Sequence, residues 1–416
     1  MNKHVIDDAR RCLQCKTPLC SRGCPVSTPI KESIHLLLNS NVEEAGKMLF
    51  QNNPLSIVCS LICPQENQCE GHCVLGKKNM PVHISAIEQY ISDYYLNIYE
   101  PRVSSRKRGN VAIIGSGPAG ITIAFMLSAR DYNVTLFEGN DQIGGMLRYG
   151  VPEFRLPKSI LDRLKDKLFD SGVKIRPNTL IGTGISVDDL FRDGFHAVFV
   201  GTGVWQPAKL DLKGESLGHV HFAIEYLRNP DVFRLGNRVL IIGAGNVAMD
   251  VARTALRHGS REVTVVCNRD ASAVTAFDVE VEYARIDGVR FEYSKSAVEF
   301  TEEGAILADS EVFTDENGWE RVRPVKGTEQ LFPADSIIIA VGQGPRSVIV
   351  SSTQGIDVKD TGLVVVDDFG HTTREGVFAS GDVVTGAKTV VEAVRFSKLA
   401  ADAIDEYVSK KLGMAE

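Results

Sequence analysis

The sequence has no apolar stretch long enough to cross a bilayer as a helix, which needs about 20 residues. It also has no basic excess, since 46 lysines and arginines against 53 aspartates and glutamates leave a formal net charge of -7. A surface that binds nucleic-acid phosphates is usually basic, so this balance argues against nucleic acid as the main ligand. The first residues lack the apolar h-region of a signal peptide, and Arg10 and Arg11 follow them directly. We therefore expect a cytoplasmic protein that binds neither nucleic acid nor membrane.

Cysteine is scarce after residue 73, where only Cys267 occurs, whereas the other cysteines lie between residues 12 and 73. The C-terminal part therefore has no Cys-x-x-Cys pair, which excludes a thioredoxin-reductase-type disulfide relay. In a reducing cytosol, a cysteine cluster is better explained by metal ligation than by disulfides. The first run, C-x2-C-x4-C-x3-C-P, and the second, which begins at Cys59, suit iron–sulfur clusters held by thiolates. Spacing alone also leaves open two structural zinc sites.

Three zones follow one another along the chain. Residues 1 to about 100 hold the cysteines between helical stretches at 30–38 and 42–51. Residues 101–109 are polar and basic, as expected of a linker at a domain boundary. From Asn110 onward, strand and helix signals alternate, which is typical of α/β layers around parallel sheets.

Two segments of the third zone share one pattern, in which a short apolar strand leads into a glycine turn and a helix. The strands are 111–114 and 239–242, and the turns are Gly-Ser-Gly-Pro-Ala-Gly and Gly-Ala-Gly-Asn-Val-Ala. In such a turn the glycines allow a tight bend, close approach of a pyrophosphate and close packing of helix on strand, and the helix N-terminus favours phosphate. Two copies predict two dinucleotide sites. The predicted contacts are Gly115, Gly117, Pro118, Ala119 and Gly120 in the first, and Gly243, Gly245, Asn246 and Val247 in the second.

The residue after the second strand of each unit distinguishes the two sites. In the first unit this residue is Glu138, whose carboxylate can accept both hydroxyls of an adenosine ribose, as FAD or NAD requires. In the second unit the strand is followed by Cys267, Asn268 and Arg269. The guanidinium of Arg269 could pair with the 2′-phosphate of NADP, although Arg269 could also be an ordinary solvated surface residue.

The C-terminal region supplies a second part of the first site. A short apolar strand ends in Gly381 and Asp382, shortly before a helix that begins near Thr389 and Val390. An acidic residue beside a helix N-terminus can bind ribityl hydroxyls while the helix end faces a flavin carbonyl. Together with the first glycine turn, these residues predict a two-part FAD site.

The combined motifs resemble the family of the glutamate synthase small (beta) subunit. That family includes the electron-input subunit of bacterial dihydropyrimidine dehydrogenase and the large subunit of an NADPH:ferredoxin transhydrogenase. The resemblance extends over nearly the whole chain and rests on CLQC at 12–15, NPL at 53–55, CEGHC at 69–73, GGMLRYGVP at 144–152, RLPK at 155–158, AVGQ at 340–343 and GD at 381–382.

The resemblance implies two [4Fe-4S] clusters and further cofactor contacts. One cluster would be held by Cys12, Cys15, Cys20 and Cys73. The other would be held by Cys24, Cys63, Cys69 and a non-cysteine ligand, Glu88, with the neighbouring Gln89 as the second candidate. Cys59 and Cys267 would be structural. Additional FAD contacts are implied at Gly145, Leu147, Arg148 and Arg155, and an NADPH contact at Gln343.

The expected fold class is α/β, with two Rossmann-like nucleotide-binding domains after an α-helical domain that holds two [4Fe-4S] clusters. The predicted boundaries are 1–104 for the iron–sulfur domain, 105–203 and 341–416 for the FAD domain, and 204–340 for the NADPH domain. We expect flavin and pyridine nucleotide to meet where these two domains adjoin.

The resemblance predicts an NAD(P)H-dependent oxidoreductase that passes electrons from NADPH through FAD and the clusters to a catalytic partner subunit, either glutamate synthase-like or dihydropyrimidine dehydrogenase-like. No catalytic acid or base is assigned, because positioning of the nicotinamide against the flavin does most of the work. Two alternatives stay open at this point. One is a self-contained NAD(P)H:ferredoxin oxidoreductase, and the other is a zinc-stabilised interaction module on a flavoprotein scaffold.

Overall fold

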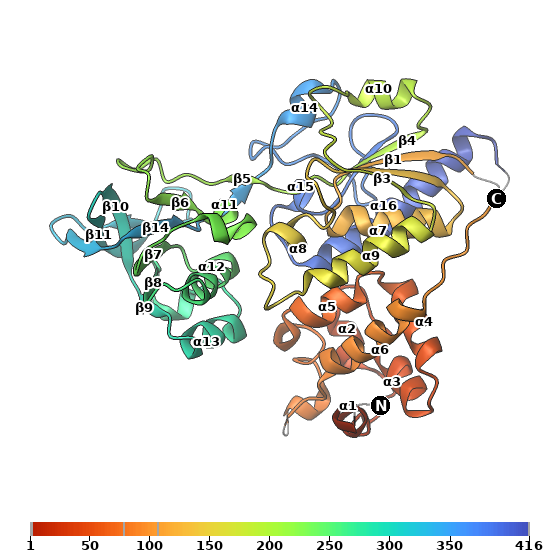
Figure 1. The fold of residues 1–416 in the computed structure, drawn as a ribbon, viewed down its shortest axis with the longest axis horizontal. Helices are drawn as coiled ribbons and strands as arrows, with labels where there is room; N and C mark the ends of the chain where they lie inside the picture. The colour runs from red at the N-terminus through yellow and green to blue at the C-terminus, as the bar shows by residue number, and fades with distance from the viewer. Residues whose placement is uncertain (1–2, 78–79, 106–107, 415–416) are drawn as a thin grey trace. The chain divides into compact units, whose positions relative to one another are not determined.

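The computed structural model describes residues 3–77, 80–105 and 108–414 (Figure 1). The chain divides into two compact units. Unit 1 comprises residues 1–148, 153–204 and 345–416, and unit 2 comprises residues 149–152 and 205–344. Among the described residues, none of the helices has the length and apolar character needed to span a membrane. Of the predicted linker, Arg106 and Lys107 lie outside the described residues, and its other residues form neither helix nor strand.

The N-terminal part of unit 1 is a cluster of short helices whose connecting loops carry most of the cysteines. Its helices are α1 (Lys3–Ala9), α2 (Leu19–Gly23), α3 (Ile30–Leu38), α4 (Val42–Asn52), α5 (Ser56–Ile62), α6 (Ile84–Ile98) and the 3-10 turns η1 (Gln65–Asn67) and η2 (Val74–Lys77). Apolar side chains at helical spacing, such as Ile34 and Leu37 on α3 and Ile87 and Ile91 on α6, are buried together in one core. The two helices predicted from the sequence are therefore present, with α4 one residue longer than expected.

The rest of unit 1 is built on a parallel sheet with the strand order β16-β4-β1-β2-β3. These strands are β1 (Asn110–Ile114), β2 (Asn133–Phe137), β3 (Lys174–Arg176), β4 (Ala197–Val200) and β16 (Val377–Ala379). All of them except the edge strand β3 are mostly apolar, as expected for strands covered on both faces. The helices of this part are α7 (Pro118–Ala129), α8 (Met146–Tyr149), α9 (Lys158–Asp170), α10 (Val187–Arg192), α14 (Val348–Ser352), α15 (Asp382–Thr385) and α16 (Val390–Lys411).

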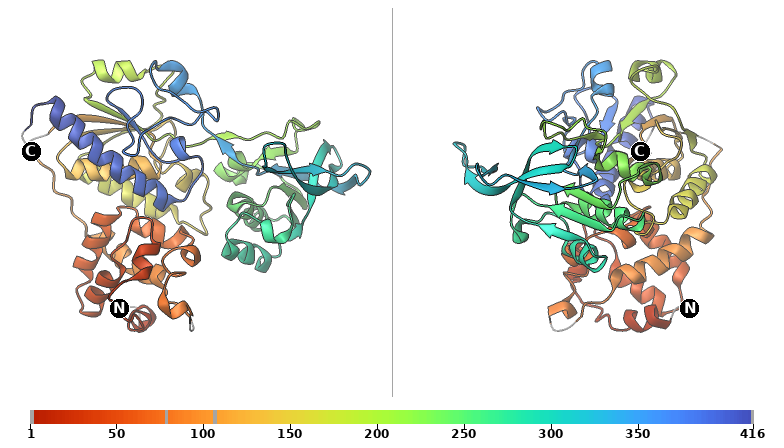
Figure 2. Two further views of the ribbon diagram at one scale, coloured as in Figure 1. Left: turned by 180° about the vertical axis from the view of Figure 1, so that it is seen from behind. Right: turned by 60° about the vertical axis from the view of Figure 1, so that its left-hand side comes forward.

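The C-terminal segment completes this sheet. Strand β16 pairs in parallel with β4, and the long helix α16 packs beside α7. The left view of Figure 2 shows α16, in blue, lying along α7. The side chain of Arg130, directly after α7, pairs with Asp405 of α16 at 3.2 Å. Residues more than 200 positions apart in the sequence therefore lie together around β1 and α7.

Unit 2 repeats the same plan around a second parallel sheet, with the order β6-β14-β7-β8-β9. Its strands are β6 (Val220–Phe222), β7 (Arg238–Ile242), β8 (Glu262–Val266), β9 (Arg290–Glu292) and β14 (Ser336–Ile339). Its helices are α11 (Ala223–Arg228), α12 (Asn246–Arg257), α13 (Asp278–Ile286) and the 3-10 turns η3 (Pro230–Val232) and η4 (Ala271–Ala273). A helical part followed by two Rossmann-like sheets is the predicted fold class, which is confirmed.

An antiparallel sheet interrupts the expected alternation of strand and helix in unit 2. It contains β10 (Lys295–Thr301), β11 (Gly304–Thr314), β12 (Glu320–Pro324) and β13 (Gln330–Pro333). Only two residues separate β10 from β11, and the turn before β12 is held by Asp315, whose Oδ1 accepts hydrogen bonds from the backbone of Asn317 and Trp319. Such short connections produce hairpins, which the sequence reasoning did not anticipate here. A separate two-stranded ribbon joins β5 (Gln206–Pro207) to β15 (Gln343–Gly344).

Candidate functional site

The first glycine turn connects β1 to α7 in the tight geometry that the sequence predicts. Gly115 has a φ of +96°, a conformation that side-chain-bearing residues rarely adopt. A Cβ on Gly120 would lie 1.9 Å from the carbonyl oxygen of Gly115, so only glycine lets the helix pack this closely on the strand. A Cβ on Gly117 would meet no atom within 4 Å, and Pro118 is the first residue of α7. The turn therefore presents bare backbone and a helix N-terminus, as a pyrophosphate requires.

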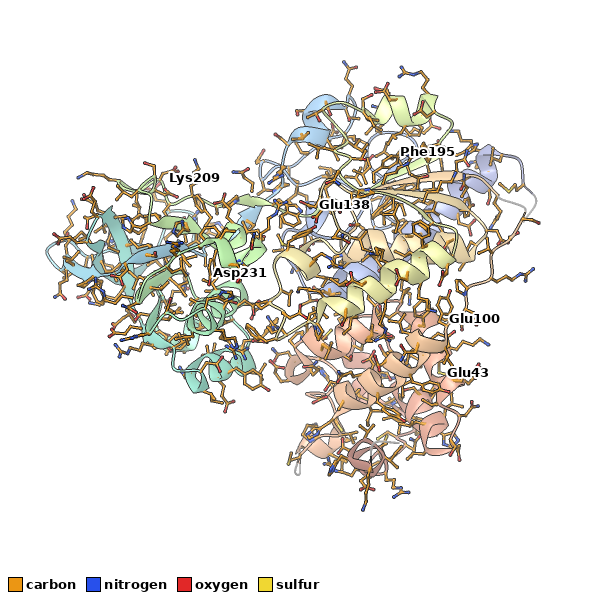
Figure 3. The ribbon with its side chains drawn as sticks, in the orientation of Figure 1. Glu43, Glu100, Glu138, Phe195, Lys209 and Asp231 are labelled. Atoms are coloured by element: carbon orange, nitrogen blue, oxygen red, sulfur yellow. The ribbon has the colours of Figure 1, made fainter. Side chains whose placement is uncertain are left out.

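Glu138 directly follows β2, beside this turn (Figure 3). Its side chain is buried, and Oε2 accepts hydrogen bonds from the backbone amide of Ser116 at 3.1 Å and from the Ser116 hydroxyl. Its Oε1 accepts two bonds from Asn140, through the backbone amide and Nδ2, each at 2.8 Å. The carboxylate is thus held at the position from which it can accept the hydroxyls of a ribose. The sequence reasoning missed Ser116 and Asn140, although Ser116 lies within the glycine turn itself.

A second segment, residues 143–148, which includes most of α8, closes against the first glycine turn. The amide of Gly144 donates to the carbonyl oxygen of Ser116 at 3.0 Å, and a Cβ on Gly145 would lie 2.8 Å from the Cα of Gly117. Arg148 anchors the segment, because its Nε donates to the carbonyl of Ile143 at 2.7 Å and its guanidinium pairs with Asp162 at 2.6 Å. Of the other two residues predicted to contact FAD, Leu147 is buried and Arg155 is half-buried in the following loop.

Gly381 and Asp382 are brought to the N-terminus of α7. A Cβ on Gly381 would lie 3.1 Å from the Cβ of Ala119, which fixes the C-terminal segment against the first turn of that helix. Oδ1 of Asp382 accepts a hydrogen bond from the amide of Lys388 at 3.2 Å, and burial raises the pKa of Asp382 to about 6. The structure thus joins the two predicted parts of the FAD site within unit 1.

Helix α16 begins beside Asp382 with a well-formed cap. The amide of Glu392 donates to the hydroxyl of Thr389 at 3.4 Å, while the amide and hydroxyl of Thr389 donate to the Glu392 carboxylate at 3.1 and 2.6 Å. This capping box leaves Val390 as the first helical residue. A second helix N-terminus is therefore available at the predicted FAD site.

The second glycine turn, in unit 2, connects β7 to α12. Gly243 has a φ of +113°, and a Cβ there would lie 2.4 Å from the carbonyl oxygen of Ala340. Oδ1 of Asn246 accepts a hydrogen bond from the amide of Phe277 at 2.9 Å, so the loop after β8 lies against the turn. Gly245 precedes α12, and Val247 is half-buried on its first turn. The turn has the same bare backbone and helix N-terminus as the first.

Arg269 lies three positions beyond the end of β8. It thus follows the second strand of the sheet of unit 2, as Glu138 follows β2 in unit 1. Its guanidinium pairs with the carboxylate of Glu320 on β12 at 3.0 Å. Its side chain is 32% exposed and that of Glu320 is 67% exposed. A partner on the antiparallel sheet was not predicted, because the strand that carries Glu320 was not predicted either. Gln343 is half-buried on β15, opposite Pro207.

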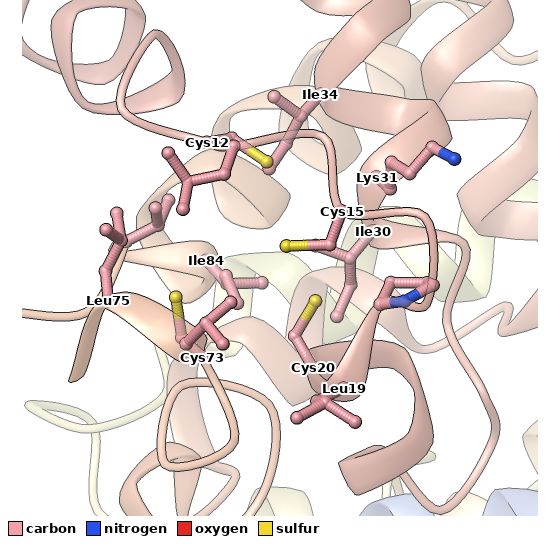
Figure 4. Close-up of a pocket in the computed structure, with 14 residues that line it drawn as sticks. Cys12, Cys15, Leu19, Cys20, Ile30, Lys31, Ile34, Cys73, Leu75 and Ile84 are labelled. Carbon is pink, nitrogen blue, oxygen red and sulfur yellow. The ribbon is translucent and has the colours of Figure 1, made fainter. Parts of the chain in front are cut away.

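Four of the predicted cluster ligands line one cavity in the helical part. The sulfurs of Cys12, Cys15, Cys20 and Cys73 turn toward a common space (Figure 4). This cavity has about 430 Å³ of empty space, open solvent at its mouth included, and its other lining residues are mostly apolar, such as Ile30 and Ile84, with the cationic Lys31 among them. The four thiols and the apolar lining fit a [4Fe-4S] cluster.

Burial raises the pKa of the Cys12 and Cys20 thiols, and the neighbouring thiol of Cys73 adds to this effect. A buried thiolate costs free energy unless a cation compensates its charge, and the iron ions of a cluster supply that positive charge. Among the described residues, no three His, Cys, Asp or Glu side chains are close enough together to hold a single metal ion.

The other four predicted ligands lie close to one another in a second group. Burial raises the pKa of Glu88 to about 8, and the negative charge of Glu88 in turn helps to raise the pKa values of Cys24, Cys63 and Cys69. The helix α6 thus presents Glu88 to these three thiols, whereas the adjacent Gln89 is exposed. Three thiols and one carboxyl group fit the predicted ligand set of the second cluster.

Cys59 is buried on α5 beside this second group. Its sulfur accepts a hydrogen bond from Nδ2 of Asn53 at 3.3 Å. A hydrogen bond with Cys59 is the main cause that raises the pKa of Cys63. Cys267 is also buried, directly after β8. No disulfide joins any of the nine cysteines, all of which lie in the described part of the chain.

Two family models match the chain. Residues 109–396 match the pyridine nucleotide-disulphide oxidoreductase family, and residues 1–99 match the dihydropyrimidine dehydrogenase domain II, 4Fe-4S cluster family. The chain is similar to the glutamate synthase [NADPH] small chain of Escherichia coli, with 32% identity over 95% of this chain and 90% of that protein. It is also similar to the NAD-dependent dihydropyrimidine dehydrogenase subunit PreT of Salmonella typhimurium, with 33% identity over 98% of this chain and 95% of that one.

Solved structures show the same fold. FprA from Mycobacterium tuberculosis, in complex with NADPH, superimposes with a TM-score of 0.61 at 18% identity, over 75% of this chain and 87% of that chain. At this level of identity the similarity concerns the fold alone.

Proposed function

The chain belongs to the pyridine nucleotide-disulphide oxidoreductase family, and from this premise we propose that it passes electrons from NADPH, through FAD and two [4Fe-4S] clusters, to a separate catalytic subunit. The predicted enzyme class, an NAD(P)H- and FAD-dependent oxidoreductase, is confirmed by the family. The predicted types of cofactor, FAD, NADPH and [4Fe-4S], are confirmed by the two family matches. The number of clusters and the residues that hold each cofactor are part of the proposal.

The observation that carries the proposal is the arrangement of unit 1. Within this unit, the FAD-type turn at Gly115, the acidic residues Glu138 and Asp382, and both cysteine groups belong to one compact body. A flavin accepts a hydride and releases its electrons one at a time, which is the conversion needed between a nicotinamide and iron–sulfur clusters. A chain that holds these sites together can therefore act as an electron-input module.

We assign roles to the residues as follows. In unit 1, Glu138 would orient the adenosine ribose, the turn at Gly117 would bind the pyrophosphate, and Asp382 would bind the ribityl chain. In unit 2, the turn at Gly245 would bind the pyrophosphate of NADPH, and Arg269 would favour the 2′-phosphate. The two cysteine groups, with Glu88, would hold the clusters.

A partner subunit is the proposed electron acceptor. The relatives are named as a small chain of glutamate synthase and as a subunit of dihydropyrimidine dehydrogenase, so each is part of a larger enzyme. We propose that this chain likewise works with a catalytic subunit, in the cytoplasm, where its thiols stay reduced.

The test is an anaerobic titration of the purified chain with NADPH and, separately, with NADH, followed by visible absorbance. Iron, zinc and flavin are counted on the same sample. We expect bleaching of both the flavin band and a broad iron–sulfur band, at a lower concentration of NADPH than of NADH. Bound zinc without iron would overturn the cluster assignment, and flavin bleaching without a cluster signal would leave a simple flavin reductase.

The partner is tested by co-purification from cells that express the chain at its natural level. A stable complex with a larger oxidoreductase subunit supports the proposal. Rapid turnover of the isolated chain with ferredoxin, and no stable complex, would instead identify a self-contained NAD(P)H:ferredoxin oxidoreductase.

A further inference from the structure

Lys398 of α16 reaches across unit 1 to the helical part that holds the cysteines. Its Nζ donates to the carbonyl oxygen of Asn52 at 2.8 Å and to Oδ1 of the same residue at 2.8 Å. The two residues are 346 positions apart in the sequence, and Lys398 is half-buried. Two bonds to one residue hold the ammonium in a fixed place.

The contact continues from Asn52 to a predicted cluster ligand. Nδ2 of Asn52 donates to the carbonyl oxygen of Val26 at 3.2 Å, and the backbone of Val26 hydrogen-bonds to the sulfur of Cys24. Lys398 is therefore linked to Cys24 through Asn52 and Val26.

The ammonium of Lys398 is also electrostatically coupled to the same ligand. Burial lowers the pKa of Lys398, while the negative charges of Asp402 and Cys24 raise it. Of the groups that act on Lys398, Asp402 is largely exposed and pairs with Arg130, so water screens it more than it screens Cys24. Asp402 has the larger effect of the two, and Cys24 is the predicted cluster ligand whose charge acts on Lys398.

Helix α16 connects this cation to the predicted FAD site. The helix starts at Val390, beside Asp382, and Lys398 lies eight residues further on, about 12 Å along the axis at 1.5 Å per residue. Helix α16 therefore runs from the predicted FAD site at its N-terminus to Lys398, whose side chain contacts Asn52 of α4 in the helical part.

We propose that the positive charge of Lys398 raises the reduction potential of the [4Fe-4S] cluster held by Cys24, Cys63, Cys69 and Glu88. This inference rests on the proposed function. A reduced cluster carries one more negative charge than an oxidised one, and a fixed cation nearby stabilises the reduced form. The effect makes transfer of an electron from the flavin to this cluster more favourable.

Lys398 could instead act only as a clamp between α16 and α4, which would stabilise the fold without changing a potential. Three variants separate these roles. K398Q removes the charge and K398R keeps it. K410Q is the matched control, since Lys410 is an exposed residue of the same helix, about 18 Å further along its axis.

The experiment is a redox titration of each purified full-length variant, monitored by electron paramagnetic resonance, with iron and flavin counted on the same sample. We expect one cluster signal of K398Q to have a lower midpoint potential than that of the wild type. K398R should restore the wild-type potential, and K410Q should not change it. In stopped-flow mixing with NADPH, the flavin of K398Q should bleach at the wild-type rate, while the cluster band bleaches more slowly.

Two outcomes would overturn the inference. The first is an unchanged midpoint potential of both clusters in K398Q, or an equal shift in K410Q. The second is loss of cluster iron from K398Q and K398R alike, which would show that Lys398 acts only as a structural clamp. Absence of cluster signals from the wild type would instead refute the proposed function.

Discussion

Arg269 and Glu320 form an ion pair of 3.0 Å between the loop after β8 and strand β12. The residue predicted to bind the 2′-phosphate of NADPH is therefore already paired with a carboxylate of the same unit. A 2′-phosphate bound by Arg269 would have to compete with Glu320 for the guanidinium, so we expect this pair to weaken the preference for NADPH over NADH.

Removal of the competing charge should strengthen NADPH binding. An exposed ion pair contributes between about 0 and 1 kcal/mol, so we expect E320Q to lower the KM for NADPH by up to about fivefold and to leave that for NADH unchanged. The measurement is steady-state dye reduction with both nucleotides. E311Q, which breaks the neighbouring pair with Arg323 on the same sheet, is the control.

R269Q should have the opposite and larger effect. A charge-assisted hydrogen bond contributes about 1.5–3 kcal/mol, so kcat/KM for NADPH should fall about 10- to 100-fold. Equal losses with NADPH and NADH would exclude a role of Arg269 in binding the 2′-phosphate.

Substitution of Glu138 should weaken FAD binding. E138Q keeps the shape of the side chain but removes the charge that we propose accepts the ribose hydroxyls, and we expect the Kd for FAD to rise about 10- to 100-fold. Flavin fluorescence during titration of the flavin-depleted protein measures this. E406Q, at an exposed position of α16, should bind FAD like the wild type.

Two cysteine substitutions should differ in their effect on iron content. C20S removes a thiol that lines the cavity shown in Figure 4, so about half of the bound iron should be lost. C59S removes a buried thiol outside both ligand sets and should retain the iron. Similar iron loss in both variants would contradict the assignment.

The adjacent residues Glu88 and Gln89 provide a sharper test of the second cluster. E88A removes the side chain that faces Cys24, Cys63 and Cys69, and should alter or abolish one paramagnetic cluster signal. Q89A changes an exposed residue and should leave both signals intact. The reverse result would make Gln89 the ligand.

Asp382 should make the stability of the flavin-free protein depend on pH. Burial raises its pKa from 3.8 to about 6, so the folded state favours the neutral carboxyl group. Its contribution to stability is complete below pH 3.8 and is lost as the pH rises through about 6. The difference corresponds to at most about 3 kcal/mol.

Thermal unfolding of wild type and D382N between pH 4 and 7.5 measures this contribution. We expect the difference in Tm between D382N and wild type to grow in favour of D382N as the pH rises to about 6.5, and then to level off. A constant difference over this range would show that Asp382 does not titrate there.

The sequence predicts those parts of the site that depend on local geometry. The glycine turns at Gly115 and Gly243 are specified by residues within six positions of one another, and they occur where expected. The same holds for Glu138, which follows directly from the end of β2.

Contacts between distant segments could not be predicted in this way. Glu320 meets Arg269 only because a hairpin folds back toward β8, and Lys398 meets Asn52 only because α16 packs against the helical part. The choice between Glu88 and Gln89 depends on the rotation of α6, since consecutive residues of a helix point about 100° apart. None of these relationships is encoded in a short motif.

The strand order of unit 1 also has a consequence for how the protein is made. Chains emerge N-terminus first at about 5–20 residues per second, so about 20–70 s separate the synthesis of Asn52 from that of Lys398. All residues proposed to hold the clusters precede residue 89. Strand β16 and helix α16, which complete the parallel-sheet part of unit 1, are made only near the end of translation. The proposed ligands for iron are therefore all synthesised before Asp382 of the proposed flavin site, so iron is the first cofactor whose proposed ligand set is complete in the growing chain.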